Sequence, residues 1–163
     1  MGMCAYFAAV DNEQIARFSQ DPDQVSTFLY PADPAAGPAH TVDIDKAWHA
    51  IHFLLNDSAS MDGSGGVQAI FGGEPIGPDL AYGPARVLHP AEVRAIAAAL
   101  SGVGETEMRA RFSSERLAEA DIYPGVWDDP EADLDYVLHS YLRLARFYAD
   151  AAQRGDGALL YIS

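Results

Sequence analysis

The sequence has a single cysteine, few basic residues and no long apolar run. Cys4 has no second thiol to pair with, which excludes a disulfide within the chain and is typical of a reducing compartment. No segment reaches the ~18 consecutive apolar residues that a membrane-spanning helix needs. Residues 1–6 have neither the basic region nor the apolar core of a signal peptide. These absences predict a cytoplasmic protein that does not enter a membrane.

Basic side chains are scarce beside acidic ones. The 163 residues include 24 acidic and 10 basic side chains, and the net charge is −14. The imbalance is greatest in residues 1–80, where Arg17 and Lys46 are the only basic residues. A field of this sign repels phosphate backbones, so we expect neither nucleic acid nor an anionic membrane as a partner. A protein partner with a basic surface is easier to accommodate.

The apolar pattern predicts one α/β domain over residues 1–163. Apolar residues make up 49% of the chain. Short apolar runs predict about four strands, in residues 4–10, 67–71, 82–88 and 158–162. Helical periodicity predicts six or seven helices between them. Strands near both ends with helices between them indicate a small mixed sheet packed by helices, in a three-layer-like arrangement; a mixed α+β fold is the alternative.

The segment Thr41–Asn56 holds most of the chemistry. At 100° per residue its apolar side chains form one helix stripe, and Asp45, His49, His52 and Asn56 lie along the edge of that stripe. A carboxylate can orient an imidazole, and two histidines can hold a metal. The spacing lacks the glutamate of the zincin helix, and no cysteine ligands are nearby. We therefore favour a core-edge His52 bonded to backbone and a solvated His49, with no metal and no cofactor.

Other candidate residues lie on later segments. The glycines of residues 63–73 do not form a phosphate loop, because no Lys-Ser/Thr pair follows and the surroundings are acidic. Tyr82 and Arg86 share one face of a predicted strand. Arg86 either binds a ligand carboxylate or, as we favour, pairs with an internal acidic residue. Tyr123 and Trp127 form an aromatic turn that packs on the core or binds a ligand.

Several short motifs occur together along the chain. They are Met1-Gly2-Met3 with Tyr6-Phe7-Ala8, Asp43-Ile44-Asp45-Lys46-x-Trp48-x-x-x-His52, Tyr82-Gly83-Pro84-Ala85-Arg86, Arg111-Phe112-Ser113 and Ile122-Tyr123-Pro124-Gly125. In combination they resemble the YfbM-like family of bacterial proteins of unknown function. The resemblance covers nearly the whole chain and implies a compact, cytosolic, single-domain α/β protein, but it supplies no catalytic residues. His52 falls inside the family pattern and His49 does not, which weakens the paired-histidine hypothesis.

Two functional hypotheses follow. The preferred one is an acidic binding or protein-interaction module, because no catalytic constellation is found. The alternative is a small-molecule-binding protein or an enzyme with a polar-aromatic pocket. The candidate ligand-binding residues are Asp45, Trp48, His52, Tyr82, Arg86, Tyr123 and Trp127. The sequence leaves both hypotheses open.

Overall fold

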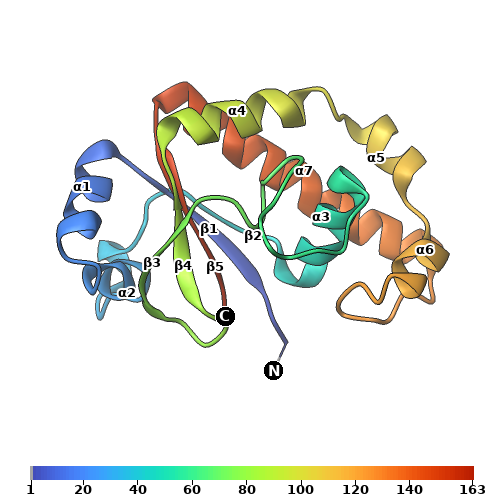
Figure 1. Cartoon of the computed structure of the whole chain (residues 1–163), viewed down its shortest axis with the longest axis horizontal. Coiled ribbons are helices and arrows are strands. Elements are labelled where there is room, and N and C mark those ends of the chain that lie inside the picture. The colour runs from blue at the N-terminus through green and yellow to red at the C-terminus, as the bar shows by residue number, and fades with distance from the viewer. Residues whose placement is uncertain (1) are drawn as a thin grey trace.

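A five-stranded antiparallel sheet forms the centre of the protein, in a computed structural model that describes residues 2–163 (Figure 1). The strands are β1 (Ala5–Val10), β2 (Thr41–Asp43), β3 (Glu74–Asp79), β4 (Pro84–Leu88) and β5 (Gly157–Ile162). Their order is β2-β1-β5-β4-β3, and every neighbouring pair is antiparallel. The two central strands come from opposite ends of the sequence. Cys4 and Ser163 extend their pairing with two reciprocal backbone hydrogen bonds of 3.0 Å.

In residues 2–163, seven α-helices and two short 3-10 helices connect the strands. They are α1 (Asn12–Gln20), α2 (Gln24–Leu29), η1 (Pro34–Ala36), η2 (Asp45–Ala47), α3 (Trp48–Asn56), α4 (Pro90–Ser101), α5 (Glu105–Arg111), α6 (Ser114–Glu119) and α7 (Pro130–Arg154). The longest helix, α7, begins where the Asp129 side chain accepts the Ala132 N–H and proline occupies the first helical position. It ends at Gly155, whose φ of 77° suits a glycine.

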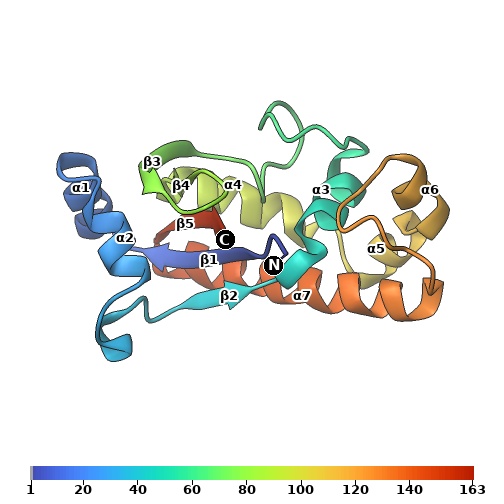
Figure 2. The same ribbon diagram turned by 90° about the horizontal axis from the view of Figure 1, so that it is seen from below.

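Helices cover both faces of the sheet. One side is packed by α1 and α2, and the other by α3, α4 and α7 (Figures 1 and 2). Side chains of β1 alternate between the two layers, because successive strand residues point to opposite faces. Phe7 and Ala9 join the cluster under α7, whereas Ala8 and Val10 join the cluster under α1. The predicted α/β single domain with three layers is confirmed.

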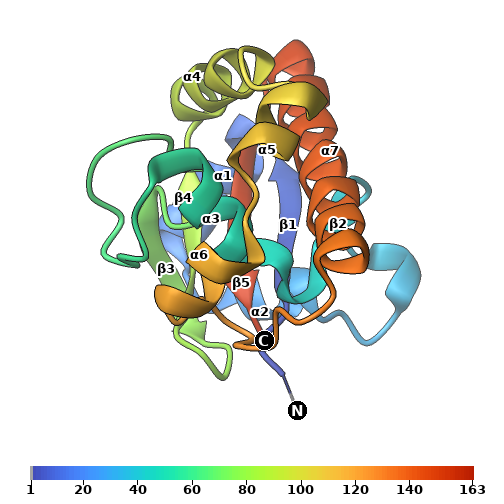
Figure 3. The same cartoon turned by 90° about the vertical axis from the view of Figure 1, so that its right-hand side faces the viewer.

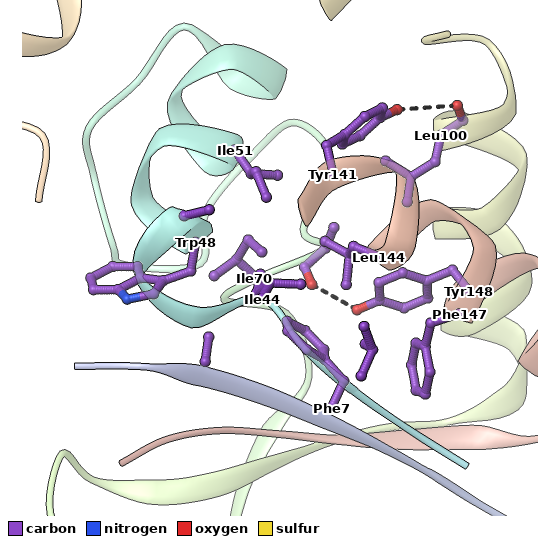
Figure 4. Packing of buried hydrophobic residues seen from close by; sticks show 14 of the residues in the cluster. Phe7, Ile44, Trp48, Ile51, Ile70, Leu100, Tyr141, Leu144, Phe147 and Tyr148 are labelled. Atoms are coloured by element: carbon purple, nitrogen blue, oxygen red, sulfur yellow. Dashed lines mark hydrogen bonds between the residues drawn. The ribbon is translucent and has the colours of Figure 1, made fainter. Parts of the chain in front are cut away.

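The larger core lies between the sheet and the α3–α4–α7 layer, and α5 and α6 extend it with the buried side chains of Met108 and Leu117. Helix α5 packs on α7 (Figure 3), and Arg116 of α6 pairs with Asp57 at the end of α3. The rings of Phe7 and Tyr148 meet there in a T-shaped arrangement, with 6.2 Å between centroids. Trp48 belongs to the same cluster, together with aliphatic side chains of α3 and α7 (Figure 4). The buried Tyr148 hydroxyl donates a 2.7 Å hydrogen bond to the Ala69 carbonyl. That bond holds the connection between α3 and β3 against α7. No helix in residues 2–163 is long and apolar enough to cross a membrane.

The prediction of a strand over residues 67–71 is wrong, since these residues form a turn. Their backbone groups form hydrogen bonds with side chains instead of with a strand. The Asn56 amide bonds to the Val67 N–H and carbonyl, and the Tyr148 hydroxyl donates to the Ala69 carbonyl. The sequence prediction also missed β2 and β3. The prolines and glycine of β3 hide its pattern, and an edge strand tolerates them because it needs fewer ladder hydrogen bonds.

Candidate functional site

A pocket of about 460 Å³ lies on the sheet face that α3 covers. Its lining residues come from the N-terminal segment, α3, the 61–75 connection, β4 and β5. Most of them are apolar, with aromatic walls from Phe7, Trp48, Phe71 and Tyr82. Among residues 2–163, one charged side chain, that of Arg86, lines the pocket. We refer to this cavity as the Arg86 pocket.

Trp48 forms a fixed wall of the Arg86 pocket. It opens α3, and its indole N–H donates a 2.8 Å hydrogen bond to the Met3 carbonyl. Its ring stacks on Tyr123 at 5.3 Å between centroids and meets the edge of Phe71 at 5.9 Å. Because the side chain is buried and its polar atom is satisfied, Trp48 presents a rigid aromatic surface.

Arg86 does not pair with an internal acidic residue, contrary to the interpretation favoured from the sequence. Its Nε donates to the Gly72 carbonyl at 2.9 Å, and its Nη2 donates to the Gly73 carbonyl at 2.5 Å. Within residues 2–163 no carboxylate oxygen lies within 4.0 Å of this guanidinium. The cation is half-buried and is solvated by two carbonyl dipoles, without a carboxylate in direct contact among the described residues.

Exposed apolar side chains gather at the mouth of the pocket. Tyr82 is 49% exposed and Met61 is 57% exposed, and both line the cavity. Large exposed apolar groups beside a concavity commonly mark a binding site. The structure therefore brings together three of the predicted site residues, Trp48, Tyr82 and Arg86.

Two further candidates lie behind the pocket wall. Tyr123 stacks on the far side of Trp48, and its hydroxyl accepts the Met3 N–H at 2.8 Å. His52 is 2% exposed and meets the ring of Phe71 edge-on at 4.8 Å. Burial lowers the pKa of His52, whose Nδ1 accepts a hydrogen bond from Asn56 at 3.2 Å. Neither side chain lines the cavity, so each acts on it only through the wall residue it touches.

His49 is 6% exposed, so the prediction of a solvated imidazole is wrong. Its Nδ1 accepts the Tyr123 N–H at 3.0 Å, and its Nε2 donates to the Ala59 carbonyl at 3.1 Å. One donor and one acceptor define a neutral ring, and burial lowers its pKa accordingly. Within residues 2–163 no three His, Cys, Asp or Glu side chains are grouped closely enough to hold a metal ion.

Asp45 belongs to a separate cluster and does not orient His49. Its carboxylate accepts hydrogen bonds from Cys4 Sγ and from the Tyr136 hydroxyl, each at 3.0 Å. The bond from Cys4 is the main reason why the pKa of Asp45 is lowered. Burial, followed by Asp45, raises the pKa of Cys4. A thiol that stays protonated beside a carboxylate is a poor nucleophile.

Trp127 also lies away from the pocket. Its indole N–H donates to the Ile122 carbonyl at 2.8 Å, and its ring is part of the main core. The sequence analysis overlooked Met61, Phe71 and Tyr161 as lining residues. Nothing in their local patterns signals a site, because they meet only after the connection folds back over the sheet.

Comparison with known proteins places this fold in a family. The model for a domain of unknown function, DUF1877, matches residues 1–161. The chain belongs to this family. It is 26% identical over 159 residues to Protein YfbM of Escherichia coli strain K12. The aligned region covers 90% of this chain and 93% of that protein. The crystal structure of YfbM, described as a protein of unknown function, matches with a TM-score of 0.74 and 25% identity over 98% of this chain and 99% of that one.

The family relation confirms the resemblance predicted from the sequence motifs. It extends over almost the full chain, so the sheet and its covering helices are shared as one unit. It assigns no activity to any residue.

Proposed function

We propose that the protein binds a small organic molecule in the Arg86 pocket. The observation that carries this proposal is a half-buried cation without a carboxylate partner in a cavity whose other lining residues are uncharged. A volume of about 460 Å³ falls within the ~300–1,000 Å³ typical of ligand pockets. Such pockets combine mostly apolar walls with a few placed polar groups, which is the composition found here.

The lining favours binding over catalysis. It contains no aspartate, glutamate, histidine or cysteine among the described residues, so the usual general acids, bases and nucleophiles are missing from it. The imidazole of His52 contacts the wall residue Phe71 but does not line the cavity. We therefore propose a binding protein rather than an enzyme that uses His52.

Nuclear magnetic resonance tests this function with the two tryptophans as built-in reporters. On titration with anilinonaphthalene sulfonate we expect the Trp48 indole N–H signal to move and the Trp127 signal to stay, since only Trp48 lines the pocket. Ile162→Trp should block the response by filling the cavity that Ile162 lines. Leu142→Trp, on the exposed side of α7, is the matched control and should leave it intact.

The proposed function would be overturned by an unchanged Trp48 signal in the native protein. An equal response in the Ile162→Trp protein would also overturn it, because the dye would then bind elsewhere.

A protein partner with a basic surface is our second proposal, in the cytoplasm that the lone unpaired Cys4 favours. Its support is the net charge of −14. Because such pairing weakens as salt screens it, a pull-down at low ionic strength is the appropriate test. Recovery of no basic protein under those conditions would contradict it.

A further inference from the structure

We infer that the ligand of the Arg86 pocket is an apolar molecule with a single carboxylate, bound by the Arg86 guanidinium; this rests on the proposed function. A guanidinium has five N–H donors. Two of them donate to the carbonyls of Gly72 and Gly73, and no other hydrogen bond of this side chain is found within residues 2–163. Three donors and one whole positive charge are therefore available to a ligand.

A carboxylate suits those donors in geometry and charge. Arginine binds carboxylates through parallel N–H···O bonds, which are stronger than neutral hydrogen bonds. Carbonyl oxygens solvate the cation but cannot neutralise it, and a half-buried charge is costly without a counterion. A bound anion would act as the counterion that no described carboxylate provides to Arg86.

The charge balance also restricts the ligand to one negative charge. The pocket lining contributes a single cation, and the protein as a whole has a net charge of −14. A phosphate monoester, with about two negative charges at neutral pH, would leave one charge uncompensated in a repulsive field. A monocarboxylate is balanced by Arg86 alone.

The rest of the ligand must be apolar to match the remaining walls. Phe7 of β1 and Leu160 and Ile162 of β5 line the cavity from the sheet. Trp48 and Phe71 line it from the segments that cover this face. These side chains offer no charge to a polar body. Burying the apolar surface of the ligand would contribute roughly 25 cal/mol per Å² to the binding free energy. The entropy lost on association is then subtracted from this gain.

Two pairs of acids and amides test the inference on the intact protein. They are hydrocinnamate with hydrocinnamamide, which have an aromatic body, and octanoate with octanamide, which have an aliphatic body. Affinities at neutral pH come from shifts of the Trp48 indole and Arg86 Nε–H signals, with Trp127 as the reference. We expect at least one acid to bind about tenfold or more tightly than its amide, because a charge-assisted hydrogen bond is lost in the amide.

Arg86→Gln should reduce that preference to less than about twofold, because the glutamine has no charge. Arg94→Gln removes an equal charge from the exposed face of α4 and should leave the preference unchanged. If Arg86→Gln fails to fold, the acid-to-amide ratio in the native protein still decides the question. The ratio within each pair also separates an aromatic from an aliphatic ligand body.

Equal binding of acid and amide would overturn the inference while leaving the proposed function intact. The same holds if anilinonaphthalene sulfonate binds at Trp48 and neither acid does. A preference for the acid that survives Arg86→Gln would place the anion elsewhere and would also overturn it. If neither the dye nor any of the four compounds moves the Trp48 signal, the proposed function and the inference both fail.

Discussion

Asn56 shows how one side chain can hold a long connection in place. Its Oδ1 accepts the Val67 N–H at 2.6 Å, and its Nδ2 donates to the Val67 carbonyl at 3.0 Å. The same Nδ2 lies 3.2 Å from His52 Nδ1. The amide thus joins the end of α3 to the turn, because it bonds to both backbone groups of Val67 as a neighbouring strand residue would. The aromatic pocket wall at Phe71 lies four residues beyond this closure.

We predict that Asn56→Asp destabilises the protein by about 3 kcal/mol, since the carboxylate cannot donate to Val67 and faces its carbonyl. Asn12→Asp makes the same chemical change at the exposed first residue of α1, where negative charge is favourable, and should stay within about 0.5 kcal/mol of the native protein. Urea denaturation measures both. Equal effects of the two substitutions would contradict this role of Asn56.

Residue-level prediction succeeded where one element supplies the chemistry and failed where several do. Tyr82 and Arg86 both line the cavity, but the predicted strand parity applies only to Arg86, because Tyr82 lies in the bend before β4. The partners of His49, which are Tyr123 and Ala59, come from other segments, so helix periodicity alone left that imidazole in solvent. The missing counterion of Arg86 could likewise be recognised only after folding.

At the scale of elements, the turn between α3 and β3 departs most from the prediction. Residues 67–71 have the apolar composition of a strand, but their backbone bonds to side chains instead of joining the sheet. Gly72 and Gly73 then bring the chain against β4, where Arg86 holds both carbonyls. By contrast, β1 and β5 were predicted to within one residue, because each is a short apolar run bounded by polar or glycine residues.

Glycine 73 is required by this turn for two reasons. Its φ is 76°, and a Cβ there would overlap the Val87 carbonyl. We predict that Gly73→Ala costs at least about 3 kcal/mol, whereas Gly155→Ala, with a φ of 77° and no atom within 4 Å of the added carbon, costs about 1 kcal/mol. Because both glycines have a similar φ, the difference between the two losses of stability measures the steric clash with Val87. Thermal or urea unfolding measures both losses. Similar losses of stability for both substitutions would contradict the clash, because β4 would then have moved away from the added Cβ at residue 73.

At the scale of the whole molecule, stability depends on pH through its buried histidines. Burial lowers the pKa of His49 and of His52 below the usual 6.5. The unfolded chain therefore binds more protons than the folded one as the pH falls below about 6.5, and stability is lost in that direction. The carboxylates stay largely ionised in the upper part of this range, so the histidines dominate there.

We predict that the free energy of unfolding falls between pH 7 and pH 5.5, by at most about 1.4 kcal/mol per pH unit for each buried histidine. His52→Asn keeps an acceptor for Asn56 but removes the titrating group, so the slope should be smaller in this variant. Urea denaturation across the range measures the slope. A stability that is constant from pH 7 to pH 5.5 would contradict neutral, buried imidazoles.

The central pairing of β1 with β5 has a consequence for biosynthesis. Residues 5–10 leave the ribosome long before residues 157–162, with which they must pair to close the middle of the sheet. Until then the apolar edge of β1 has only the short β2 beside it. Distant partners of this kind slow folding and leave strand edges open to aggregation. A nascent chain arrested before β5 should therefore be sensitive to proteases and should bind chaperones, whereas the released protein resists both.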